Sequence, residues 1–160
     1  MNHELRRDER RMPDDDARQL LESADYGVLG LGGSDGEPYT VPLNYVVSGE
    51  TVLVHCATEG RKLAILRESP RVSFTVVGDY QILPDRFTTH YRSVHVSGTA
   101  RVVHDAAERR SALLLLGRKY APDLAAEAER YVDSAFTETA VVEIAIDTVT
   151  GKQNPSPQSR

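Results

Sequence analysis

The stretch YGVLGLGGSDGEPYTVPLNYVVSGETVLVHC, residues 26–56, decides the fold because it holds three apolar runs separated by two short glycine-containing turns. Such runs predict strands, here at residues 26–31, 39–47 and 51–56. A parallel pair needs a crossover of about a dozen residues or more, and both turns are much shorter. We therefore expect the three strands to form an antiparallel sheet.

The rest of the chain predicts three more strands and several helices around them. The strands are expected at residues 71–77, 93–103 and 139–147, and the helices at residues 14–24, between 61 and 70, at 105–120 and at 123–134. Residues 78–90 are expected to be irregular, and Asp105 is placed to cap the third helix. Six strands with peripheral helices predict a closed, mainly β antiparallel barrel rather than a doubly wound parallel sheet.

The 160 residues are 40% hydrophobic and 27% charged, which indicates one globular domain. We expect a polar segment at residues 1–13, the domain at residues 14–152 and a disordered tail at residues 153–160. A net charge of −5, with basic and acidic residues interspersed, argues against nucleic-acid binding. The chain lacks a membrane-length apolar run and a secretory signal, so we expect a cytoplasmic protein with no membrane association.

Alternation along two of the predicted strands separates their side chains into two faces. In residues 51–56, Cys56 shares a face with Val52 and Val54 and is expected to be a buried small hydrophobe, whereas His55 points to the other side. By itself, such a histidine is more often a hydrogen-bonded edge residue than a catalyst. In residues 91–102, an apolar face alternates with a polar, uncharged face that would meet water, a ligand or another subunit.

Residues 58–62 (TEGRK) have the composition of an anion site. Thr58 can cap the following helix, Gly60 removes a side chain from its first turn, and Arg61 and Lys62 add two cations beside unpaired amides. Glu59 counts against this interpretation. Two solvated cations on a helix remain the alternative.

Several other motifs fail on spacing. The glycines of residues 30–36 do not match a dinucleotide fingerprint, and residues 59–62 lack the end of a P-loop. His90, His95 and His104 do not have metal-ligand spacing, so no metal is expected. The single cysteine excludes an internal disulfide and a multi-cysteine zinc site.

Four blocks in order resemble the FMN-binding split-barrel superfamily, whose fold is that of pyridoxamine 5′-phosphate oxidase. They are residues 39–45 (YTVPLNY), 54–63 (VHCATEGRKL), 91–98 (YRSVHVSG) and 150–152 (TGK). The nitroimidazole-resistance proteins are the branch they resemble most. The resemblance implies a six-stranded antiparallel split β-barrel that forms a homodimer, with FMN lying across the subunit interface.

The resemblance also implies roles for individual residues. Arg61 and Lys62 would bind the FMN phosphate, aided by Ser93 on what is expected to be a neighbouring strand. His55 and Cys56 would lie near the phosphate and the ring, and His55 is the candidate catalytic residue. The residues that would pass the isoalloxazine ring and donate backbone hydrogen bonds to it are Thr40, Val41, Pro42, Leu43 and Asn44.

One departure narrows the implied function. The oxidase's C-terminal Trp and Arg motif is missing, since the chain has no Trp, which argues against oxidation of pyridoxamine phosphate. We expect an FMN-dependent oxidoreductase of small electron-poor molecules, for example a nitroaromatic reductase, with NADH or NADPH as candidate donor. The alternatives are a non-catalytic flavin- or haem-binding barrel and a barrel without a cofactor. FAD or a deazaflavin would fit the same groove, and residues 78–90 would cover the substrate.

Overall fold

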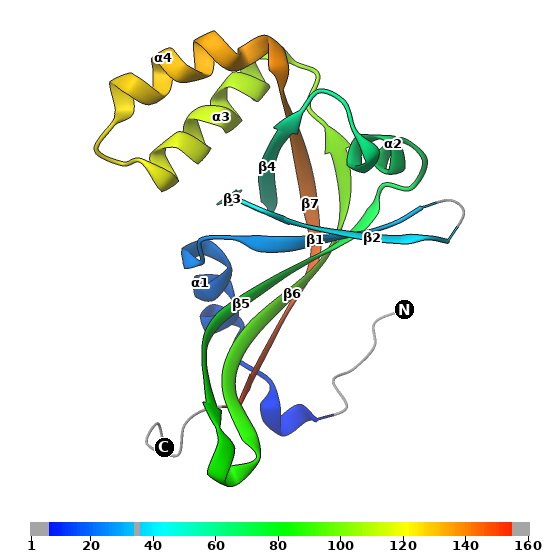
Figure 1. The fold of residues 1–160 in the computed structure, drawn as a ribbon, viewed down its shortest axis with the longest axis vertical. Helices are drawn as coiled ribbons and strands as arrows, with labels where there is room; N and C mark the ends of the chain where they lie inside the picture. Colours follow the sequence, from blue (N-terminus) through cyan, green and yellow to red (C-terminus); the bar gives the residue numbers. More distant parts are fainter. Residues whose placement is uncertain (1–6, 34–35, 155–160) are drawn as a thin grey trace.

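The computed structural model describes residues 7–33 and 36–154, which form one antiparallel sheet with helices around it (Figure 1). Within these residues the sheet has seven strands in the order β2-β1-β5-β6-β7-β4-β3. The strands are β1 (Gly27–Gly32), β2 (Pro38–Leu43), β3 (Tyr45–Ser48), β4 (Thr51–Ala57), β5 (Arg71–Leu83), β6 (Thr88–Val102) and β7 (Thr139–Asn154). The α-helices are α1 (Asp14–Ser23), α2 (Arg61–Glu68), α3 (Ala106–Tyr120) and α4 (Ala125–Ala135).

The seventh strand arises because the strand expected at residues 39–47 changes partner at Asn44. Its first half, β2, pairs with β1, and its second half, β3, pairs with β4. These halves are the two edges of the sheet, so one residue links both edges and the sheet must roll up. The mainly β antiparallel prediction is confirmed. The strand number of six is wrong, and so is the expected closure, because β2 and β3 do not pair with each other in the described sheet.

The rolled sheet encloses a core built around Tyr45 and Phe74. Both side chains are fully buried, and their rings meet edge to face with centroids 4.9 Å apart. Tyr45 lies on edge strand β3 and Phe74 on β5, the third strand counted from the other edge, so their contact crosses the barrel interior. The Tyr45 hydroxyl donates a hydrogen bond to the Leu21 carbonyl, which satisfies this polar group inside the core.

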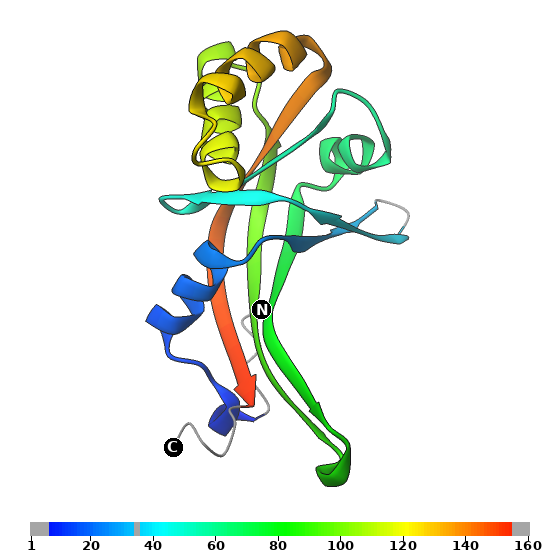
Figure 2. The same ribbon diagram turned by 60° about the vertical axis from the view of Figure 1, so that its left-hand side comes forward.

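Strands β5 and β6 continue far beyond the barrel as a two-stranded arm (Figure 2). Residues 78–90 are therefore mostly strand, which corrects the expectation of an irregular stretch. A register shift between Val77 and Tyr80 accommodates Gly78, where an added Cβ would lie 2.7 Å from Leu20 of α1. A 3₁₀ turn at Pro84–Arg86 closes the arm, and β7 runs beside it to Asn154. The tail expected to be disordered thus contributes residues 153 and 154 to β7, and the rest of it lies outside the described residues.

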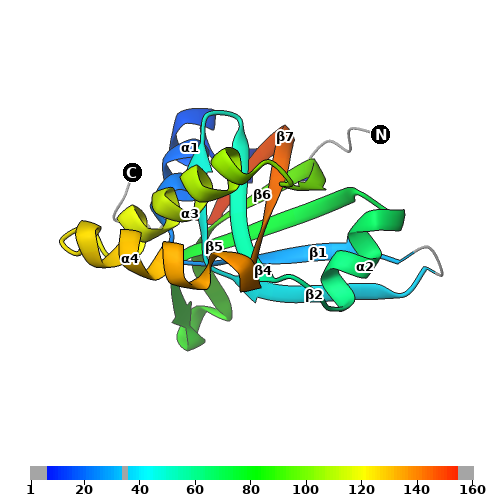
Figure 3. The same ribbon diagram turned by 90° about the horizontal axis from the view of Figure 1, so that it is seen from above.

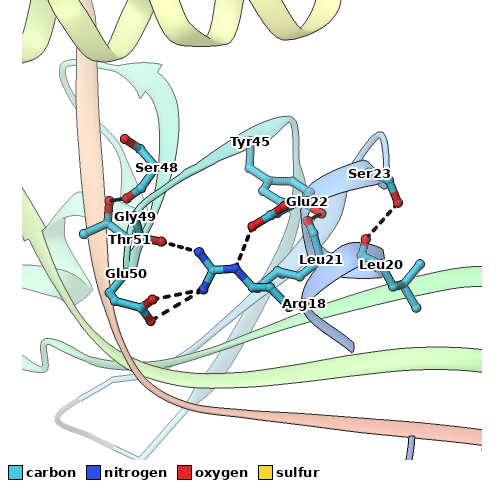
Figure 4. Close-up of polar contacts among 10 residues, drawn as sticks. All are labelled: Arg18, Leu20, Leu21, Glu22, Ser23, Tyr45, Ser48, Gly49, Glu50 and Thr51. Atoms are coloured by element: carbon cyan, nitrogen blue, oxygen red, sulfur yellow. Dashed lines mark hydrogen bonds and ion pairs between the residues drawn. The ribbon is translucent and has the colours of Figure 1, made fainter. Parts of the chain in front are cut away.

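Helix α1 is attached to the barrel by apolar and ionic contacts. Met12, within the segment expected to be polar, is fully buried beside Gly151, whose lack of a side chain admits both Met12 and Ala17. On the other side, Arg18 links α1 to the β3–β4 turn (Figure 4). Its guanidinium donates to the Gly49 carbonyl and forms ion pairs with Glu22 at 2.7 Å and Glu50 at 3.5 Å.

Helices α3 and α4 cover the outer face of β4 and β7 (Figure 3). Asp105 caps α3 as predicted, since its carboxylate accepts a hydrogen bond of 2.8 Å from the Glu108 backbone N–H. A second apolar cluster lies beneath these helices and contains Leu53, Val103, Ala112, Leu113, Leu116, Val132 and Val141. None of the helices in the described part of the chain has the length and apolar character needed to span a bilayer.

The packing at Gly98 predicts a large cost for adding one methyl group. Gly98 lies at a register shift between β6 and β7, where an added Cβ would be 2.4 Å from the Ala145 carbonyl oxygen. Gly98→Ala is expected to lower the free energy of unfolding by about 1–3 kcal/mol, measured by denaturant titration. Gly32→Ala is the matched control, because an added Cβ there meets nothing within 4 Å. Equal effects at the two positions would contradict the assigned register.

Candidate functional site

The end of β4 presents two titratable side chains on opposite faces, as the alternation predicted. Cys56 is half-buried and packs against the barrel core. His55 is on the face that carries Leu53, beside helices α3 and α4, and is exposed although it lines a pocket there. The end of β4 therefore places one titratable side chain against the barrel core and the next one beside helices α3 and α4.

Helix α2 begins three residues after β4 ends, and Gly60 is its N-cap residue. Gly60 has φ +135°, a backbone conformation that side chains strongly disfavour, so glycine is required for this turn. The expected cap by Thr58 is wrong, because the helix starts at Arg61 and no described side chain caps it. The first-turn N–H groups of α2 are thus left to water or to a ligand.

Lys62 is half-buried and lies where it acts on both titratable groups of β4. Burial lowers the pKa of His55, and the positive charge of Lys62 lowers it further. Burial raises the pKa of the Cys56 thiol, opposed by the charge of Lys62 and by a hydrogen bond from it. At neutral pH the imidazole is therefore neutral and the thiol is protonated. Among the described residues, no carboxylate forms an ion pair with Lys62.

Arg61 points away from this group, toward β2. Its guanidinium forms an ion pair with Glu37 at 2.9 Å and lies 5.0 Å from the centroid of the Tyr39 ring. Both partners of the ion pair are largely exposed, and such a pair stabilises by less than about 1 kcal/mol. The two cations that the sequence places together are therefore separated in the structure, and Arg61 can exchange its partner at little cost. Glu37 and Tyr39 were not found by the sequence analysis.

Residues 40–44 lie along edge strand β2 and the following corner. Thr40, Pro42 and Asn44 are exposed, while the side chains of Val41 and Leu43 pack on the barrel core. The outer edge of β2 has no strand partner among residues 7–33 and 36–154, so its backbone groups can hydrogen-bond a ligand. Asn44 is partly engaged, because its Nδ2 donates to the Asp25 carbonyl at 3.1 Å.

Ser93 does not join the other candidate residues within one chain. It pairs with Lys152 on β7, whereas His55 pairs with Val141, eleven residues away on the same strand. That spacing corresponds to about 35 Å of strand. β7 also separates β6 from β4, whereas β6 pairs with β5, the strand that follows α2.

A pocket of about 360 Å³ opens beside His55, between helices α3 and α4 and the end of β4. The sequence analysis did not find it. The only local signals are tyrosines on the two helices, Tyr120 and Tyr131, which are 39% and 74% exposed. Neither position shows which strand the helices cover, so tertiary packing was needed to reveal the pocket.

Comparisons with known proteins confirm the resemblance. Residues 13–153 match the family described as pyridoxamine 5′-phosphate oxidase. A candidate 5-nitroimidazole antibiotic resistance protein from Bacteroides thetaiotaomicron is similar in structure, with 25% identity, a TM-score of 0.75, and coverage of 88% of this chain and 84% of that one.

Two more distant structures share the fold. Flavocytochrome Anf3 from Azotobacter vinelandii is 19% identical, with a TM-score of 0.82 and coverage of 97% and 74% of the two chains. The FAD and heme binding protein from Mycobacterium smegmatis is 21% identical, with a TM-score of 0.76 and coverage of 90% and 72%. The curated proteins contain no match. Since the family match spans nearly all of the described residues, this chain belongs to the pyridoxamine 5′-phosphate oxidase family.

Proposed function

We propose that the protein is a homodimeric, FMN-dependent oxidoreductase that acts on a small electron-poor molecule such as a nitroaromatic compound. The observation that carries the proposal is Lys62, a half-buried cation without a carboxylate partner among the described residues, beside the uncapped start of α2. An ammonium ion next to free helical N–H groups suits a phosphate monoester. The backbone also leaves room for it, because Gly60 has no neighbour within 4 Å of an added Cβ.

The remaining groups fit a flavin ring attached to that phosphate. The free edge of β2 at residues 40–44 can hydrogen-bond the polar edge of a ring, and Arg61 can leave Glu37 to reach the phosphate. When bound, FMN supplies the redox chemistry, taking and passing on hydride or single electrons. The protein's part is to hold the ring and limit access of water to it.

His55 is suited to proton transfer or hydrogen bonding beside that ring. Its lowered pKa keeps the imidazole neutral at pH 7, so one ring nitrogen donates and the other accepts a hydrogen bond. It can therefore stabilise negative charge on a reduced substrate by donating its N–H, or transfer a proton to it.

A second subunit would complete the site. Ser93 would contribute from another copy, because in its own chain it pairs eleven residues along β7 from the partner of His55. The arm that was expected to cover the substrate also points away from α2 (Figure 1). It exposes Tyr80, Ile82 and Phe87, the last with 99% of its surface accessible, as an arm that packs on a partner would.

The names of the similar proteins support flavin chemistry and give one alternative. Two of them are described as binding flavin or haem, so a non-catalytic binder is the second candidate function. The two candidates differ in turnover. A protein that takes up FMN, yet whose flavin is never reduced by NADH or NADPH, would support the binder and contradict the oxidoreductase.

Lys62→Ala is expected to weaken FMN binding by about 1.5–3 kcal/mol, since a charge-assisted phosphate contact is lost. Fluorescence titration measures this, with riboflavin as the matched ligand that lacks phosphate. Riboflavin affinity should be unchanged, and Arg67→Ala, in the last turn of the same helix, should leave both affinities unchanged. Equal loss of FMN and riboflavin affinity would remove Lys62 from the phosphate site.

His55→Ala is expected to leave FMN affinity nearly unchanged and to lower turnover by about 10²–10⁴-fold if His55 transfers a proton. Stopped-flow oxidation of the reduced flavin by a nitro compound measures the step. Rates equal to those of the wild-type protein would make His55 a structural residue.

The pKa of His55 should also respond to Lys62. Burial and the positive charge both disfavour the imidazolium, so the wild-type pKa lies below 6.5. Lys62→Met removes the charge and keeps most of the bulk, so the pKa should rise but stay below 6.5, because burial is the larger cause. NMR titration of the His55 ring protons checks this. An unchanged pKa would show that the two groups do not interact.

A further inference from the structure

The pocket beside His55 has the size of a small-molecule site. Its volume of about 360 Å³ falls in the range of roughly 300–1,000 Å³ that such sites occupy. It is lined by Asn44, His55, Leu113, Leu116, Gly117, Tyr120, Ala128, Tyr131, Val132, Ala135 and Thr139. Figure 3 shows α3 and α4 lying side by side next to β4, and the pocket lies between these elements.

Small residues at the helix contact set the shape of the pocket. Gly117 of α3 faces Ala128 of α4 so closely that an added Cβ at Gly117 would lie 3.1 Å from the Ala128 methyl. The buried side chains of Leu113, Leu116 and Val132 form the apolar base. A larger side chain at position 128 would therefore fill the pocket.

The described side chains that line the pocket carry no formal charge at neutral pH. There is no Asp, Glu, Lys or Arg among them, and the pKa of His55 is lowered by burial. An ionised ligand would lose hydration without gaining a partner on this surface. The pocket therefore selects against charged compounds.

Most polar groups of the pocket are already satisfied by the backbone. The Tyr120 hydroxyl lies 2.7 Å from the Asp25 carbonyl and 2.8 Å from the Tyr45 N–H. The Thr139 hydroxyl donates to the Ala135 carbonyl, and the Asn44 amide donates to Asp25. His55 differs, because its ring makes no hydrogen bond to any residue that the structure describes. His55 and the exposed Tyr131 hydroxyl are therefore polar groups that remain for a ligand, and His55 lies at the end of β4.

We propose that this pocket binds the substrate, a small uncharged ring compound that packs on the apolar base and directs one polar substituent to His55. The assignment as substrate site rests on the proposed function, because His55 is near enough to Lys62 to be affected by its charge and so lies between the pocket and the proposed flavin site. The pocket's neutrality separates this substrate class from phosphorylated ones such as pyridoxamine phosphate.

Two probes with the same nitrophenyl ring test the proposal: 4-nitrobenzyl alcohol, which is uncharged, and 4-nitrobenzoate, an anion. Calorimetric titration of the protein, with and without FMN, is expected to show at least tenfold tighter binding of the alcohol in the FMN-loaded protein. Ala128→Phe should weaken binding of the alcohol at least tenfold by filling the pocket. Ala126→Phe, on an exposed part of the same helix and outside the pocket lining, should have no effect.

A second variant covers the case in which Ala128→Phe disturbs folding. Tyr131→Ala removes an exposed wall of the pocket and should weaken binding of the alcohol at least threefold. Unchanged alcohol binding in the folded pocket variants, or tighter binding of the benzoate to the FMN-loaded protein, would overturn the proposal. Failure to take up FMN would contradict the proposed function instead, and the titration without FMN would still decide whether the pocket binds the alcohol.

Discussion

The structure depends on one constraint, which is that consecutive strands form opposite edges of the same sheet. Asn44 alone separates β2 from β3, so the seven-stranded sheet has to roll, although its two edge strands do not pair with each other. The corner is held firmly. The Tyr120 hydroxyl accepts from the Tyr45 N–H, and the Lys119 ammonium lies 4.0 Å from the centroid of the Tyr45 ring. Helix α3 is thereby fixed against the barrel where the edges join.

The same corner explains where the candidate site lies. Rolling the sheet brings the free edge of β2 to the side on which β4 ends and α2 begins. At the end of β4, adjacent side chains point to opposite faces: Cys56 faces the barrel core, and His55 faces the pocket under α3 and α4. Lys62 lies near both. If the cofactor-binding site and the substrate pocket both lie at the end of β4, the reacting groups would be close together without any large movement of the chain.

Local patterns in the sequence predicted much of this, and tertiary pairing explains the rest. Alternation placed His55 and Cys56 on opposite faces, and Asp105 is a cap that sequence alone reveals. The break at Asn44 could not be found, because residues 39–47 read as one continuous strand. Gly78 and Pro84 suggested an irregular loop, yet pairing between β5 and β6 overrides these local signals. The order of the strands in the sheet and the pocket between α3 and α4 arise only when the chain folds. Neither could therefore be predicted from local sequence patterns.

The central claim is that the start of α2 binds the phosphate of FMN and that the flavin ring lies along β2. A crystal structure of the protein with bound FMN tests it most directly. The account predicts the phosphate within hydrogen-bond distance of Lys62 Nζ and of first-turn N–H groups of α2, with the ring edge against residues 40–44. FMN bound elsewhere, with Lys62 still beside Cys56 and no phosphate near it, would contradict the account.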